Sequence, residues 1–119
     1  ILAYGGAPLN AVFAADTHLQ PGLMRMALAP FMGVILHPLE PTLHLPNLSG
    51  HFLVLEGKVD ELMPEKARTT LRDAVPEPKT IVVFDGNHMG VGPDKAELLA
   101  KIIRTSEDWL IKMGAVNPL

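Results

Sequence analysis

The pattern of apolar and polar positions contains four short apolar runs, separated by segments with helical spacing or turn residues. The runs cover residues 1–4, 23–29, 52–55 and 80–84. Each run is short and lies next to glycine or proline, which is typical of strands that are buried on both faces. Because strands that alternate with helices form parallel sheets with helices on both sides, we expect an α/β fold.

Three other segments have the signals of helices. The first begins at Pro8, because a proline at the first helical position loses no hydrogen bond, and it ends before Pro21 and Gly22. The second covers residues 64–74, and the longest covers residues 93–113. These helices alternate with the apolar runs, as an α/β fold requires.

The longest helix and the segment before the third run carry further expectations. In the helix, the spacing predicts an inner face made of four apolar residues: Ala96, Leu99, Ile103 and Leu110. Its charged residues are expected to face water: Lys95, Glu97, Lys101 and Arg104. Residues 30–50 hold four prolines and two glycines, so we expect an irregular crossover with a short helical turn near residues 32–36.

Composition narrows the function classes. The chain has 119 residues, 48% hydrophobic and 19% charged, which suits one globular domain. Its net charge is −3 without a basic stripe, so we expect no nucleic-acid partner. No apolar stretch approaches the ~18 residues of a membrane span, so we expect no membrane partner. The absence of cysteine excludes disulfides and thiolate catalysis, and favours a cytoplasmic location.

Two polar loops follow neighbouring strands of the predicted sheet. "FLVLEGKVDELMP" carries Asp60 after one strand, and "IVVFDGNHMG" carries His88 after the next. Ligands of open α/β sheets bind at the carboxyl ends of the strands. There, an aspartate can accept a hydrogen bond from the Nδ1–H of a histidine, whose Nε2 is then free to act as a base. Each residue alone is typical of an ordinary turn, and only their joint placement favours an Asp60–His88 pair.

With these loops the chain resembles the C-terminal half of an α/β-hydrolase-fold protein. Gly57, Asp60 and Pro64 resemble the acid loop of that family, and Gly86-Asn87-His88 resembles its histidine loop. The family order is nucleophile, acid, histidine. The resemblance implies an esterase-like or acyl-hydrolase ancestry, a small-molecule substrate, and a missing N-terminal half supplied by the same or a second polypeptide. We therefore expect residues 1–119 to be a single domain or the C-terminal part of one.

The nucleophile position departs from the family pattern. A G-x-S-x-G turn aligned on Gly5 places Ala7 where serine belongs, Pro8 after it and Leu9 at the second glycine. Alanine has no hydroxyl, and proline has no N–H for an oxyanion. Three departures together favour natural divergence over a single serine-to-alanine replacement. We therefore expect a degenerate catalytic triad, and activity is left open.

No other residue is expected to replace the serine. Ser106 lies in the longest helix, Ser49 precedes a strand at the opposite edge of the sheet, and Thr17 lies in or after a helix.

Metal and cofactor signals are weak as well. His37, Glu40 and His44 are metal-ligand types, but their spacing differs from the helical two-histidine zinc motif, so we expect no metal site. The sequence "GGAP" lacks the Lys-Ser/Thr of a phosphate loop, so we expect no cofactor.

Three hypotheses for the function stay open. The first is an acyl hydrolase in which His88, oriented by Asp60, activates water directly. The second is a non-hydrolytic enzyme of the same fold, in which the pair removes a substrate proton. The third is a catalytically silent member that binds a small molecule or a protein. Descent from hydrolases is the expectation that all three share.

Overall fold

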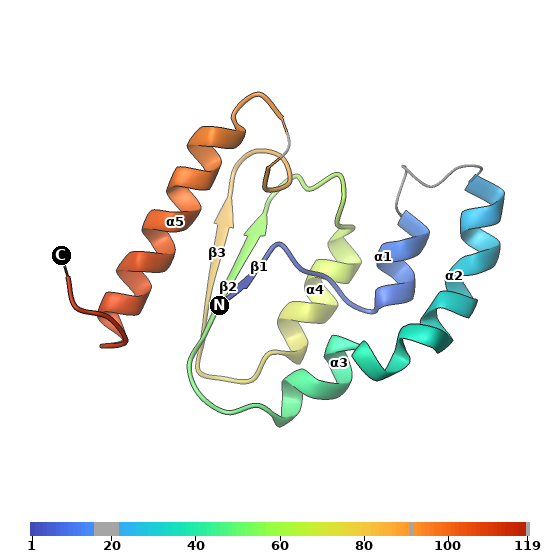
Figure 1. The fold of residues 1–119 in the computed structure, drawn as a ribbon, viewed down its shortest axis with the longest axis horizontal. Helices are drawn as coiled ribbons and strands as arrows, with labels where there is room; N and C mark the ends of the chain where they lie inside the picture. The colour runs from blue at the N-terminus through green and yellow to red at the C-terminus, as the bar shows by residue number, and fades with distance from the viewer. Residues whose placement is uncertain (16–21, 91, 119) are drawn as a thin grey trace.

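A three-stranded parallel sheet forms the centre of the molecule, with strand order β1-β2-β3 (Figure 1). The computed structural model describes residues 1–15, 22–90 and 92–118. Its strands are β1 (Leu2–Ala3), β2 (Phe52–Gly57) and β3 (Lys79–Phe84). Its helices and 3₁₀ turns are α1 (Leu9–Ala15), α2 (Gly22–Leu36), η1 (His37–Leu39), α3 (Pro41–His44), η2 (Leu45–Asn47), α4 (Glu65–Ala74) and α5 (Lys95–Lys112). The expectation of an α/β arrangement with a parallel sheet is confirmed.

The alternation of side chains along β2 builds two hydrophobic layers. Leu53 and Leu55 pack with α5 in a cluster that also contains Tyr4, while Val54 packs with Leu71 of α4 on the opposite face. In Figure 1, α5 and α4 accordingly lie on opposite sides of the strands. Burying each such aliphatic side chain contributes about 1.5–3 kcal/mol, so β2 is the centre of the core.

The predicted strand at residues 23–29 is wrong, because these residues belong to α2. Most of the described side chains of this run are exposed, among them Leu23 at 82% and Met26 at 66%, and Ala29 is buried. The physical reason is composition. The run consists mainly of leucine, methionine and alanine, which favour helices, and lacks the β-branched and aromatic residues that favour strands. The helix continues through Pro30, and the helical turn expected near residues 32–36 is its last part.

The predicted inner face of α5 is also wrong, although the helix itself is confirmed. Leu98 and Ile102 are buried, whereas Leu99 and Ile103 are 45% and 58% exposed. The sequence pattern is ambiguous because the apolar residues come as the adjacent pairs Leu98-Leu99 and Ile102-Ile103. Two neighbouring faces of the helix therefore carry apolar residues at the same spacing. The contact with β2 and Tyr4 selects the face that starts at Leu98.

The helical stretch Gly22–Asn47 is long and apolar enough, by length and composition, to cross a membrane, and only 6% of its most apolar window is buried. The stretch is divided into α2, η1, α3 and η2. A membrane-spanning helix needs continuous backbone hydrogen bonding, which such divisions interrupt. The expectation that no apolar stretch approaches the length of a membrane span is therefore wrong, while the expectation of no membrane partner stays a prediction.

Candidate functional site

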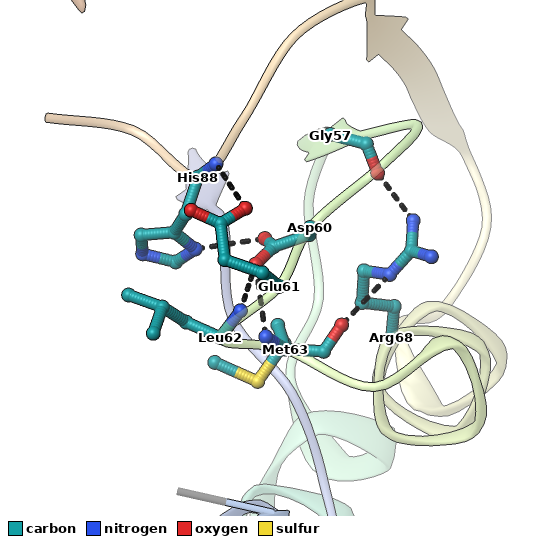
Figure 2. A network of polar contacts seen from close by, with 7 residues as sticks. All are labelled: Gly57, Asp60, Glu61, Leu62, Met63, Arg68 and His88. Carbon is teal, nitrogen blue, oxygen red and sulfur yellow. Dashed lines mark hydrogen bonds and ion pairs between the residues drawn. The ribbon is translucent and has the colours of Figure 1, made fainter. Parts of the chain in front are cut away.

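The loop after β2 holds Asp60 in a fixed orientation. Its Oδ1 accepts hydrogen bonds from the backbone N–H groups of Leu62, at 3.0 Å, and Met63, at 2.8 Å (Figure 2). Aspartate favours such turns because its short side chain can reach the amides that follow it. The Asp60 side chain has no exposed surface, so its carboxylate is held by the protein and not by solvent.

The loop after β3 brings His88 to this carboxylate. Asp60 Oδ2 lies 2.7 Å from His88 Nδ1, and the imidazole is 18% exposed (Figure 2). An ionised carboxylate can only accept a hydrogen bond, so the contact favours the tautomer in which Nδ1 carries the proton. Nε2 then keeps its lone pair. The backbone N–H of His88 also approaches Glu61 Oε2 at 3.4 Å, a long contact.

Parallel pairing explains why these two loops meet. β2 and β3 pair in parallel, with Gly57 beside Phe84 at their carboxyl ends. The N–H of Lys58 donates to the carbonyl of Phe84 at 2.8 Å, which ties the start of one loop to the start of the other. The sequence therefore places Asp60 and His88 at one edge of the sheet, and the structure brings them into contact.

Tyr4 is the third residue at this edge, and the sequence analysis did not find it. It follows β1 directly and has a φ of 54°, the only positive φ of a non-glycine residue among the described positions. Such a conformation is uncommon and unfavourable for a bulky residue. Its ring lies edge-on to the His88 ring, with 5.3 Å between centroids and 80° between planes.

The hydroxyl of Tyr4 is buried without a hydrogen-bond partner in the part of the chain that the structure describes. Burial raises the pKa of the phenol, and the negative charges of Asp60 and Asp94 raise it further. Tyr4 is thus a neutral phenol at neutral pH, packed against the Asp60–His88 pair.

Ala7 does not lie at the tip of the turn, and the proposed alignment needs correction. It is completely buried, its N–H donates to the carbonyl of Ala67 at 2.9 Å, and it packs in the cluster on the α4 side. The strand ends at Ala3, so the residue with the strained turn conformation comes three positions earlier than expected. Ala7 is a core residue in this structure.

Two glycines, Gly5 and Gly6, directly follow Tyr4 in this turn. A Cβ on Gly6 would lie 2.4 Å from Met63 Sδ and 3.1 Å from Ala67 Cβ, and one on Gly5 would lie 2.8 Å from Leu71 Cδ2. A side chain at Gly6 would therefore displace Met63 and press on Ala67, whereas at Gly5 only the end of the Leu71 side chain would have to move. The signal available in the sequence was the pair of glycines immediately after Tyr4.

The other candidate residues lie elsewhere. Ser106 is in α5, Ser49 precedes β2 at the amino end of that strand, and Thr17 is outside the described residues.

Two of the three metal-ligand types in the 37–44 segment, Glu40 and His44, have other contacts. Glu40 accepts a hydrogen bond from the N–H of Leu9 at 2.8 Å, and Thr42 donates to it at 3.3 Å. His44 Nε2 lies 2.7 Å from the carbonyl of Pro38. Within residues 1–15, 22–90 and 92–118, no group of three or more histidine, aspartate or glutamate side chains could hold a metal ion.

The site therefore contains a carboxylate, an imidazole and a neutral phenol, which together can move a proton but offer no serine or cysteine nucleophile. Searches among family models, curated proteins and solved structures found no significant match to this chain.

Proposed function

We propose that this chain is an α/β-hydrolase-like protein in which the Asp60–His88 pair acts as the general base on an ester or a related acyl substrate. The single observation that carries the proposal is the 2.7 Å contact between Asp60 Oδ2 and His88 Nδ1 at the carboxyl edge of a parallel sheet. A strained turn at Tyr4, an acid loop and a histidine loop follow β1, β2 and β3 in the order nucleophile, acid, histidine.

The proposed reaction needs no covalent intermediate. His88 Nε2 takes a proton from a water molecule as the water oxygen forms a bond with the acyl carbon. The bond from that carbon to the alcohol oxygen then breaks, and the imidazolium returns the proton to the leaving alcohol. Asp60 keeps the imidazole in the required tautomer and stabilises its charged form. Tyr4 does not attack, because burial keeps its phenol protonated.

A specific observation favours a second candidate, in which the same pair removes a carbon-bound proton from its substrate. Tyr4 lies in the strained turn after β1, which this proposal assigns to the nucleophile position, and its hydroxyl has no partner among the described residues. A protein that has replaced its nucleophile by a phenol can keep the His–Asp base for chemistry without acyl transfer.

One arrangement in the sheet supports the expectation of a further polypeptide segment. β1 has two residues and pairs only with β2 among the described residues, so its other edge is open. An edge strand leaves backbone N–H and C=O groups unpaired, and a further strand can pair with them. We infer that a strand from another part of the protein or from a second chain pairs with this edge.

The function is tested by the turnover of a panel of fluorogenic acyl esters by the wild-type protein and by His88→Ala. The hydrolase proposal expects turnover above background in the wild type, lowered at least about a hundredfold by loss of the base. Equal background rates in both proteins would refute it. Deuterium incorporation into substrate carbon positions that depends on His88 would support the second candidate, and thermal stabilisation by a ligand without either reaction would support the silent binder.

A further inference from the structure

Arg68 of α4 bridges the two ends of the acid loop, residues 57–63 (Figure 2). Its Nε donates to the carbonyl oxygen of Met63 at 3.2 Å, and its Nη1 donates to the carbonyl oxygen of Gly57. Gly57 is the last residue of β2, and Met63 comes shortly before α4 begins. One guanidinium therefore joins the point where the loop leaves the sheet to the point where it enters the helix.

Met63, whose carbonyl is bound by Arg68, also binds the Asp60 carboxylate. The carbonyl of Met63 accepts from Arg68, and the N–H of Met63 donates to Asp60 Oδ1 at 2.8 Å. Asp60 Oδ2, the other oxygen, contacts His88 Nδ1. A continuous series of polar contacts thus leads from Arg68 through Met63 and Asp60 to His88.

The chemistry of arginine suits this task better than that of lysine. A guanidinium is planar and has several N–H donors in a fixed arrangement, so it can satisfy two carbonyls in different directions at once. A lysine ammonium is a compact charge at the end of a flexible chain and has no such fork. The two carbonyls would otherwise need other donors, because an unpaired buried acceptor is unfavourable.

We propose that Arg68 is a positioning residue, which holds the acid loop in the shape that presents Asp60 to His88. The inference rests on the proposed function for its relevance to catalysis, but its geometry can be tested without turnover. Arg68 acts through the two loop carbonyls and not through its charge, and it touches neither reacting atoms nor His88.

The test compares Arg68→Gln and Arg68→Lys with Lys66→Gln in the full-length chain. Lys66 is exposed on the same helix, so its replacement removes an equal charge as a matched control. Hydrogen exchange reports on the N–H groups of Leu62 and Met63, which bond to Asp60. We expect exchange at both to become about tenfold faster or more in both Arg68 variants, with interior α4 amides unchanged. The NMR signal of the proton on His88 Nδ1 should shift or broaden in the same two variants.

Three results would overturn the proposal. The first is unchanged exchange at Leu62 and Met63 in Arg68→Gln. The second is wild-type behaviour of Arg68→Lys, which would show that the planar guanidinium is not required to hold the loop. The third is equal acceleration in Lys66→Gln or throughout α4, which would mean general destabilisation. Absence of ester turnover in a wild-type protein that shows the expected exchange pattern would refute the proposed function and leave the role of Arg68 standing.

Discussion

The strand β2 and the helix α2 are both rich in apolar residues, but they bury them to very different extents. In β2, Leu53 and Leu55 are 0% and 1% exposed, whereas in α2, Leu23 and Val34 are 82% and 75% exposed. β2 directs alternate side chains to two helical layers. α2 is apolar around its whole circumference, so no single neighbour can cover it. The comparison teaches that an apolar run contributes to the core only where the spacing of its side chains directs them toward neighbouring helices or strands.

The largest expected effect is the difference between two leucine-to-alanine substitutions, one in β2 and one in α2. Leu55→Ala removes a fully buried side chain and should lower the free energy of unfolding by about 3 kcal/mol. Leu23→Ala removes an exposed one and should change it by less than about 0.5 kcal/mol. Denaturant titration of both variants measures the two values. Similar losses in the two variants would show that α2 is covered in solution, and would break the comparison.

The next effect is expected where the segment that follows α2 is tied to α1. Glu40 accepts the hydrogen bond of the Leu9 N–H at the start of α1, a position at which helix amides have no partner within the helix. Glu40→Ala should therefore lower the free energy of unfolding by about 1 kcal/mol, as the loss of a helix cap does. Thermal unfolding measures the change, with Glu107→Ala at an exposed site as the control. A loss no larger than that of the control would mean that this cap is not formed.

The smallest effect is expected from Tyr4→Phe, and it depends on pH. The folded-state pKa of Tyr4 is raised above the ordinary value of 10.0 by burial and by nearby carboxylates. Its contribution to stability is complete below pH 10.0 and is lost as the pH rises through the folded pKa, because the unfolded chain ionises first. Tyr4→Phe should remove this part of the loss of stability at alkaline pH, because phenylalanine has no group that ionises. At neutral pH it should leave stability equal or slightly higher, since the hydroxyl that it removes has no partner among the described residues.

Tyr4 is the only tyrosine of the chain, so the absorbance of its phenolate reports the titration without overlap. A midpoint at or below pH 10.0 in the folded protein would contradict the buried position of the ring.

The sequence was sufficient to predict the two loops of the site, because the residues of each loop and the strand before it indicate the same structure. The strand, glycine and aspartate around Gly57 and Asp60, and the strand and turn before His88, predicted two loops at one edge of a parallel sheet. The contact follows from parallel pairing, which needs no knowledge of side-chain packing. This is why the Asp60–His88 pair could be expected from the sequence.

The sequence was insufficient where tertiary packing decides between equivalent patterns. The inner face of α5 depends on which of two adjacent apolar stripes meets β2, and the position of the turn depends on the residue at which β1 ends. For that reason Ala7 was placed at the turn, while Tyr4 occupies it. Arg68 was missed because its contacts are to backbone carbonyls, which no side-chain motif records.

The most direct test of the central claim is the NMR spectrum of the ring nitrogens of His88, assigned among the five histidines with His88→Gln. In the wild-type protein, at a pH at which the ring is neutral, we expect the proton on Nδ1, an unprotonated Nε2, and loss of this arrangement in Asp60→Asn. A neutral ring with its proton on Nε2 in the wild type, or an identical spectrum in Asp60→Asn, would contradict the claim that Asp60 prepares His88 to act as a base.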